Sequence, residues 1–135
     1  MTPQTANFIA AALEALSDAK GNMSINIYRQ AARLAYYAQF HAAQALIFER
    51  TGKITKTHKG VQAQFHKLGT TEPRLAPGFP GNLSAAYRYK QIADYDAGAA
   101  VPVTQTEARD AIEVAEQFVA AIRMVLLQPS GSAVP

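Results

Sequence analysis

The sequence has no cysteine among its 135 residues, and this absence removes several classes of chemistry. A chain without cysteine cannot form disulfide bonds, bind zinc through thiolates or use a thiol nucleophile. It also has no run of the roughly 20 apolar residues that a membrane-spanning helix needs. The first residues carry no basic leader ahead of their apolar stretch, so no secretory signal is predicted. We therefore expect a cytoplasmic protein with no membrane partner.

The common signatures of nucleotide-binding and hydrolytic enzymes are missing as well. No GxGxxG, P-loop, HExxH or GxSxG pattern occurs in the chain. The three histidines, His41, His58 and His66, do not stand at metal-ligand spacing with carboxylates, and two of them lie in a lysine-rich stretch that repels divalent cations. The sequence therefore predicts no metal site and no cofactor.

Acidic residues are scarce in one part of the chain. Residues 19–71 hold eight Lys or Arg against one acid, Glu49, whereas the remainder holds five basic and nine acidic residues. The net charge of +3 hides this asymmetry. Such a split predicts one positive face that could meet phosphate, although a set of merely solvated lysines would give the same pattern.

Alanine is abundant and β-branched residues are few, which favours helices throughout the chain. Apolar residues recur at helical spacing in about residues 5–20, 23–50, 61–68, 83–95 and 104–127. We predict an all-α protein, an up-and-down bundle of four to five helices over residues 1–128, followed by a flexible tail over residues 129–135.

Breakers and caps set the expected helix ends. Gly21 and Gly52 are predicted to end the first two helices. Thr55 or Thr57 is a plausible N-cap for the third helix, and Thr104 with Glu107 fits a capping box at the start of the last one. In the second helix a stripe that begins at Ile27 continues through alanines, beside a second line of arginine and aromatic residues. That helix is therefore expected to be covered on more than one side.

Arg33, Tyr37 and His41 form the first candidate site. They are spaced by four along the longest helix and share one face, with Tyr36 and Phe40 beside them. A guanidinium next to aromatic rings and an imidazole can hold a phosphate and stack a base. The same polar groups could instead satisfy hydrogen bonds within a core.

Lys56, His58 and Lys59 form the second candidate site, at a predicted helix start. Backbone amides at a helix N-terminus attract anions, and neighbouring lysines strengthen that attraction. The alternative is a capped turn with solvated lysines.

Arg88, Lys90, Asp94 and Tyr95 form the third candidate site, near the end of the fourth predicted helix. Lys90 and Asp94 are an i, i+4 pair, and Arg88 and Tyr95 are seven residues apart, which places them on a shared face. Tyr95 stands between two aspartates, which disfavour its phenolate, so it is predicted to form hydrogen bonds rather than to act as a base.

Three segments together carry a family resemblance: AYYAQFHAAQA at 35–45, KTHKG at 56–60 and ADYD at 93–96. In this order they resemble the HEPN superfamily, in particular its small UPF0332 branch, over about residues 5–127. The resemblance implies a helical bundle that commonly dimerises. Active HEPN relatives are metal-independent ribonucleases, and many are toxins encoded beside a nucleotidyltransferase antitoxin.

The resemblance also implies where catalysis would occur. Active relatives use an arginine followed, after four to six residues, by a histidine; Lys90 and Tyr95 stand at these positions here, and Arg88 could partly substitute. In some relatives a tyrosine near this motif is nucleotidylated, which makes Tyr95 a candidate acceptor. A tyrosine with a pKa of about 10 is a poor base at pH 7, so a degenerate ribonuclease is expected to bind rather than cleave.

The resulting functional prediction has three branches. The first is a HEPN-like protein, a homodimer or toxin component, that binds RNA or nucleotide phosphate. The second is a non-catalytic interaction module that partners a nucleotidyltransferase. The third is a small-molecule pocket on the aromatic face of the long helix. If the chain is an enzyme, the residues predicted for catalysis are Arg88, Lys90, Asp94 and Tyr95. Those predicted for RNA or phosphate binding are Arg33, Tyr37, His41, Lys56, His58 and Lys59.

Overall fold

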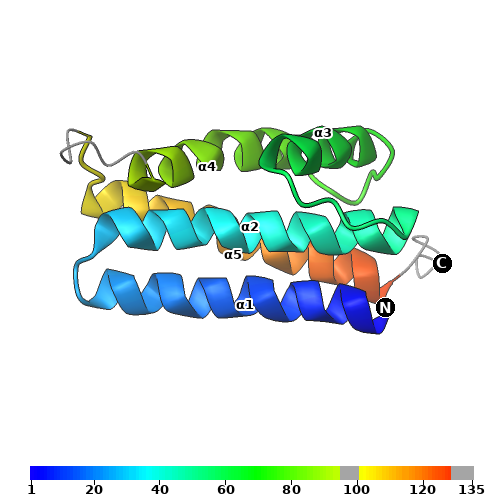
Figure 1. Cartoon of the computed structure of the whole chain (residues 1–135), viewed down its shortest axis with the longest axis horizontal. Helices are drawn as coiled ribbons and strands as arrows, with labels where there is room; N and C mark the ends of the chain where they lie inside the picture. The colour runs from blue at the N-terminus through cyan, green and yellow to red at the C-terminus, as the bar shows by residue number, and fades with distance from the viewer. Residues whose placement is uncertain (95–100, 129–135) are drawn as a thin grey trace.

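A computed structural model describes residues 1–94 and 101–128 and shows five helices. They are α1 (Pro3–Ser24), α2 (Tyr28–Thr51), α3 (His58–Gly69), α4 (Phe79–Asp94) and α5 (Gln105–Leu127). Figure 1 shows α1, α2 and α5 running along the long axis of the molecule, with α3 and α4 lying on the other side of α2. No strand occurs in the described residues, so the predicted all-α bundle is confirmed.

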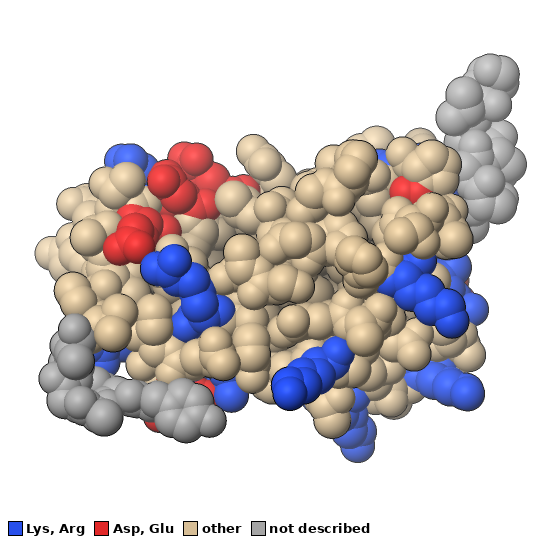
Figure 2. All heavy atoms as spheres, turned by 90° about the horizontal axis from the view of Figure 1, so that it is seen from above, with Lys and Arg blue, Asp and Glu red and all other residues tan. Residues whose placement is uncertain are grey.

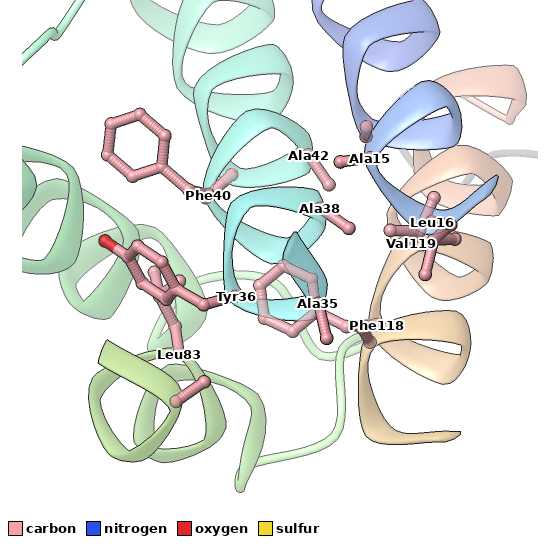
Figure 3. Packing of buried hydrophobic residues seen from close by; sticks show 14 of the residues in the cluster. Ala15, Leu16, Ala35, Tyr36, Ala38, Phe40, Ala42, Leu83, Phe118 and Val119 are labelled. Atoms are coloured by element: carbon pink, nitrogen blue, oxygen red, sulfur yellow. The ribbon is translucent and has the colours of Figure 1, made fainter. Parts of the chain in front are cut away.

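The central helix, α2, is buried on several sides, as its sequence predicted. Figure 3 shows the small side chains of Ala35, Ala38 and Ala42 directed toward α1 and α5, where Ala15 contributes another small contact. Alanines let two helix backbones approach closely, and these three on α2 are at most 1% exposed. On the other side of α2, Tyr36 extends toward α3 and α4. The helix thus separates an alanine-lined interface from an aromatic one.

The first helix does not end at Gly21, and that prediction is wrong. α1 continues to Ser24 and the chain then reverses through Asn26, whose φ of 64° is in the left-handed region that asparagine tolerates better than most residues. A glycine inside a helix costs only about 1 kcal/mol. The partial burial of Met23, which packs against the core beyond this glycine, supports the longer helix. Ile27 falls in the turn and is 45% exposed, so it is not part of the buried stripe.

The fourth helix begins at Phe79, four residues before the predicted start. Pro80 is compatible with the first turn of a helix, where its missing N–H is not needed. The Phe79 ring packs against Phe118 of α5 at a centroid distance of 5.5 Å, which fixes this early start. A Cβ on Gly69, at the end of α3, would approach Pro80 Cγ to 2.8 Å, so the α3–α4 junction is close-packed and favours glycine there.

The predicted caps are confirmed for α3 and α5. Thr57 accepts a hydrogen bond from the Gly60 amide at 3.0 Å and begins α3. Thr104 and Glu107 form the reciprocal capping box that begins α5. The predicted tail, residues 129–135, lies outside the described residues. None of the helices in residues 1–94 and 101–128 combines the length and apolar character needed to cross a membrane.

A buried carboxylate ties several elements together at one end of the bundle. Glu72, in the α3–α4 connection, is 5% exposed and accepts hydrogen bonds from Arg74 at 2.7 and 2.9 Å and from Arg50 at 2.9 Å. Arg74 also donates to the carbonyl of Gln128, just after α5. The bonds from Arg74, helped by those from Arg50, lower the pKa of Glu72 to about 2.

Candidate nucleic-acid interface

Helix α2 aligns the first group of site residues by its periodicity. Arg33 and Tyr37 are four residues apart, and the Arg33 guanidinium carbon lies 5.0 Å from the centre of the Tyr37 ring. Tyr36 and Phe40 lie on the adjoining line of the same helix, with ring centroids 5.9 Å apart. A row of aromatic rings therefore runs along α2 with a guanidinium at one end, and two of these rings, Tyr36 and Phe40, are buried.

The start of α3 brings His58 against this row of rings. Thr57 is the N-cap, so His58 is the first helical residue. A Cβ at position 60 would come within 2.5 Å of Thr57 Oγ1 and 3.0 Å of Thr55 Cγ2, so the tight turn favours glycine there. The His58 ring packs 4.7 Å from Phe40, measured between centroids.

Helix α4 supplies the opposite wall. Tyr87, Lys90 and Asp94 follow one another at spacings of three and four, which is one helical face. The Tyr87 ring stacks on His58 at 5.3 Å with an interplanar angle of 30°, and the Lys90 ammonium lies 5.8 Å from the centre of the Tyr87 ring. Three helices thus meet in one group, which we call the aromatic–basic cluster. Its members are Arg33, Tyr36, Tyr37, Phe40, His58, Tyr87, Lys90 and Asp94.

The hydrogen bond between Tyr36 and His58 fixes the state of the imidazole. The Tyr36 hydroxyl lies 2.6 Å from His58 Nδ1. Burial, followed by the neighbouring Tyr37 and Tyr87, raises the pKa of Tyr36 well above its usual range, so the hydroxyl keeps its proton and donates it. Burial and then the nearby Lys90 lower the pKa of His58, which favours a neutral ring. A neutral ring that accepts at Nδ1 carries its proton on Nε2 and can donate from there.

Two cations from different helices converge on one carboxylate. Asp94 accepts from Lys90 Nζ at 2.7 Å and from Arg33 Nε at 3.1 Å. The bond from Lys90, followed by its charge and that of Arg33, lowers the pKa of Asp94, and the same bond raises the pKa of Lys90. The side chains of these three residues are between 18% and 30% exposed, so the ion group is accessible from the surface.

The structure brings together only some of the predicted site residues. Arg33, Tyr37, His58, Lys90 and Asp94 share the cluster, although they come from two separate phosphate-binding predictions and the catalytic one. The exposed lysines Lys56 and Lys59 flank its α3 side. Tyr95 lies outside the described residues.

His41 lies at the edge of the cluster, with its ring centroid 6.0 Å from that of Tyr37 and 5.6 Å from that of Phe40, whereas Arg88 is directed elsewhere. His41 Nδ1 lies 2.9 Å from Gln44 Oε1, and Gln44 Nε2 donates to the Thr55 carbonyl at 2.9 Å, which links α2 to the connector before α3. Arg88 pairs with Glu107 of α5 at 3.4 Å. Arg88 is therefore not placed to substitute for an arginine at position 90.

The surface over α3 and α4 has an uneven charge distribution. In Figure 2, which looks onto these helices, most of the visible acidic side chains gather at the upper left beside some basic ones, whereas the side chains along the lower edge and at the right end are mostly basic. The described residues contain no group of three or more side chains suited to hold a metal ion. Within the cluster, two cations stand against one carboxylate, so the group carries a net positive charge next to aromatic rings.

Comparison with known proteins places this arrangement in a family. The sequence model of the HEPN domain matches residues 6–125, which is most of the chain. The chain belongs to the HEPN family. The predicted resemblance is thereby confirmed.

Two relatives are similar to this HEPN chain over more than half of its length. One, named "Putative toxin MJ0605", is from Methanocaldococcus jannaschii; it is 33% identical over 118 residues, which cover 87% of this chain and 85% of the relative. The other, named "UPF0332 protein", is from Archaeoglobus fulgidus; it is 31% identical over 80 residues, which cover 59% of this chain and 62% of the relative.

Sequence reasoning missed one member of the cluster, Tyr87. Its signal was present, because Tyr87 stands three residues before Lys90 and so shares its face of a helix. Tyr36 and Phe40 were noticed only as neighbours of the first candidate site. Their contact with His58 depends on how α3 packs, which local spacing does not reveal.

Proposed function

We propose that this HEPN domain binds RNA through the aromatic–basic cluster. The observation that carries the proposal is the convergence of two cations from different helices, Arg33 and Lys90, on one partly exposed position, which the Asp94 carboxylate now occupies. The rings of Tyr37 and Tyr87 lie beside these cations. Phosphate oxygens are the anions that such paired cations bind well. Proteins recognise single-stranded RNA by stacking unpaired bases on aromatic rings next to such contacts.

The basic groups in and beside the cluster have distinct roles in this proposal. Arg33 offers a planar fork of N–H donors and Lys90 a compact ammonium, so both can contact one phosphate group. His58 adds a neutral donor at Nε2. The lysines before and within the first turn of α3, Lys56 and Lys59, extend the positive surface along the backbone of a bound strand.

A salt titration of RNA binding tests the proposal. Binding of a short single-stranded RNA, followed by fluorescence anisotropy, should weaken with salt because phosphate contacts release counterions. Changing Arg33→Ala together with Lys90→Gln should weaken binding and reduce the slope of log K against log salt by about one to two.

A matched control separates a specific site from total charge. Lys20→Gln with Arg123→Ala removes the same two positive charges from α1 and α5, at a separate pocket that both residues line. This pair should leave the slope nearly unchanged. An equal loss in both double variants would mean that RNA responds only to net charge, and the proposed site would be wrong.

RNA binding does not by itself imply RNA cleavage. Metal-independent cleavage needs groups that move protons at the 2′-hydroxyl and the leaving oxygen. Lys90 can stabilise phosphate charge, but Arg88 is turned toward α5 and does not add to it. Restoring the pattern of active relatives with Lys90→Arg and Tyr95→His is the direct way to look for a latent ribonuclease.

The name of the first relative supports a toxin-related role for this chain. We propose RNA as the target on the ground of the aromatic–basic cluster alone. A nucleotidyltransferase antitoxin is then the partner that we propose. A reading frame for such an enzyme beside this gene would agree with that role.

A further inference from the structure

A groove between α1 and α2, which we call the α1–α2 groove, opens beside the aromatic–basic cluster. It has a volume of about 360 Å³, at the lower end of the usual range for ligand pockets. Two of its lining residues, Arg33 and Tyr37, also belong to the cluster. Because Arg33 donates from Nε to the Asp94 carboxylate at 3.1 Å, one side chain borders both the proposed phosphate position and the groove.

The α2 side of the groove offers surfaces for stacking. Tyr37 and His41 are four residues apart on this helix, with ring centroids 6.0 Å apart, and both are partly exposed. Leu34, also partly exposed, adds an apolar side chain to the same wall. A flat aromatic molecule can pack against such a wall, as the unpaired bases of single-stranded RNA do on protein rings.

The α1 side of the groove carries two carboxylates. Glu14 and Asp18 are four residues apart, so they share one face of the helix, and both are exposed. The ion pairs formed among residues 1–94 and 101–128 include neither of them. Their oxygens are therefore available to accept hydrogen bonds from a molecule in the groove.

These two charges determine which part of a nucleotide can enter the groove. A phosphate would be repelled by Glu14 and Asp18, whereas Arg33 and Lys90 attract it beside the groove. An uncharged base that carries N–H donors is favoured instead, since a carboxylate is a strong acceptor. A nucleotide whose phosphate is held by the two cations can thus place its base beside Tyr37, with its polar edge toward the carboxylates.

The four RNA bases differ in the donors that they would present to a carboxylate. Guanine has two N–H donors side by side, at N1 and N2, which match the two oxygens of one carboxylate. In adenine and cytosine the exocyclic amine adjoins a ring nitrogen that is an acceptor, and in uracil the single N–H lies between two carbonyls. Those acceptors would face a negatively charged oxygen, so the groove favours guanine.

We propose that the α1–α2 groove selects a guanine base in the RNA that the aromatic–basic cluster binds. One of the two carboxylates, Glu14 or Asp18, accepts from N1–H and N2–H, and the Tyr37 ring packs against the base. The inference rests on the proposed function, because it assigns a base to the strand whose phosphate Arg33 and Lys90 hold.

Single-stranded RNAs that differ at one base test this selection. Three oligouridines carry guanine, hypoxanthine or adenine at one central position, so their total charge is identical. Hypoxanthine keeps the N1–H of guanine but lacks its N2 amine. In fluorescence anisotropy the guanine strand should bind about tenfold more tightly than the adenine strand, with the hypoxanthine strand between them.

Variants then connect the preference to the two carboxylates. Glu14→Gln together with Asp18→Asn should erase it, because a side-chain amide presents one acceptor and one donor and so matches guanine no better than adenine. Asp110→Asn together with Glu113→Gln makes the same change in charge on α5, outside the groove lining, and should leave the preference intact. The ratio of the two affinities is the readout, since a change in net charge alters both strands alike.

Equal binding of the three strands would overturn the guanine assignment and leave the RNA proposal standing, whereas failure of all three to bind would refute RNA binding itself. An equal loss of the preference in both double variants would also overturn the assignment to the groove.

Free guanosine carries no phosphate and tests the groove independently of the cluster. In NMR spectra it should shift the methyl resonances of Ala11, Ala15 and Leu34 more strongly than adenosine does at the same concentration. Shifts no larger than those from adenosine would refute the selection of guanine by this groove.

Discussion

Asp94 occupies the position between Arg33 and Lys90 that the proposed phosphate would take. Its carboxylate accepts from both cations, and the pKa lowered by Lys90 and Arg33 keeps it ionised at neutral pH. An RNA phosphate must therefore compete with a group of the protein itself.

The change Asp94→Asn should consequently strengthen RNA binding, although it alters a residue at the centre of the site. Removing the competing charge should lower Kd about three- to tenfold, measured by anisotropy at low salt. Glu113→Gln on α5 makes the same change in net charge away from the site and should have a smaller effect. Weaker binding by Asp94→Asn would show instead that the carboxylate is needed to hold the two cations in place.

Part of the cluster could be predicted at the level of single residues, and the reason is periodicity. Arg33 with Tyr37, and Lys90 with Asp94, stand four residues apart, so each pair had to share a face. The same geometry explains why the prediction that Arg88 could substitute at position 90 was wrong. Two residues correspond to about 200° around a helix, so Arg88 and Lys90 point to opposite sides. The contact between α2 and α4 joins residues far apart in sequence, which spacing cannot reveal.

At the scale of helices, Glu72 joins the end of α2 to the α3–α4 connection, and Arg74 continues the link to the end of α5. Since the carboxyl is almost fully buried, it depends on its two arginines for compensation. These contacts hold the short α3–α4 layer onto the long helices.

Glu72→Gln should destabilise the fold by about 2 kcal/mol at pH 7, because both arginines lose their ionic partner. The folded-state pKa of about 2 lies below the usual 4.5, so ionised Glu72 favours folding above pH 4.5. That contribution is lost as the pH falls from about 4.5 toward 2, and the variant should lack this part of the acid sensitivity. Urea unfolding at pH 7 and at low pH measures both effects.

A second glutamate provides the comparison. Glu116 pairs with Lys20 at 2.8 Å, but both side chains are about half exposed, and such pairs contribute at most about 1 kcal/mol. Glu116→Gln should therefore have little effect at either pH. If Glu72→Gln and Glu116→Gln had the same effect on stability, the buried ion group would not be what holds the α3–α4 connection onto the long helices.

Helix identity was predictable, whereas several helix ends were not. Alanine content and apolar periodicity indicated five helical segments, and Thr57 and Thr104 were recognisable as caps. The end at Gly21 and the start near Leu83 were wrong because tertiary packing outweighed local preference. The packing of Met23 against the core favours the longer α1, and the contact of Phe79 with Phe118 favours the earlier start of α4.

At the scale of the whole molecule, the other helices of the bundle cover α2 on several sides without a second copy of the chain. The homodimer was implied by the resemblance to HEPN proteins, and the alanines of α2 offer no surface for it because they are buried within the monomer. Large apolar side chains remain exposed on α5 instead, with Met124 at 62% and Leu127 at 65%. The dimer stays a prediction, and these residues are now its proposed contact.

Sedimentation at micromolar concentration should show a species of twice 14.5 kDa. Met124→Lys should shift it toward the monomer, since a charge in an apolar contact opposes association. Ile54→Lys makes the same type of change at an exposed residue of the connector and should leave the dimer intact. A monomer in the unmodified protein would refute this prediction.

The alanine-lined contact of α1 with α2 also has a consequence for how the chain assembles during translation. The two helices are consecutive and joined by a three-residue turn at 25–27. Their contacts are therefore local in sequence and form quickly during folding. This hairpin is complete once Thr51 has left the ribosome, long before α5 is synthesised. We therefore expect an N-terminal hairpin to form first and the last helix to dock onto it, so that until release the growing chain exposes the apolar side of α2 that α5 later covers.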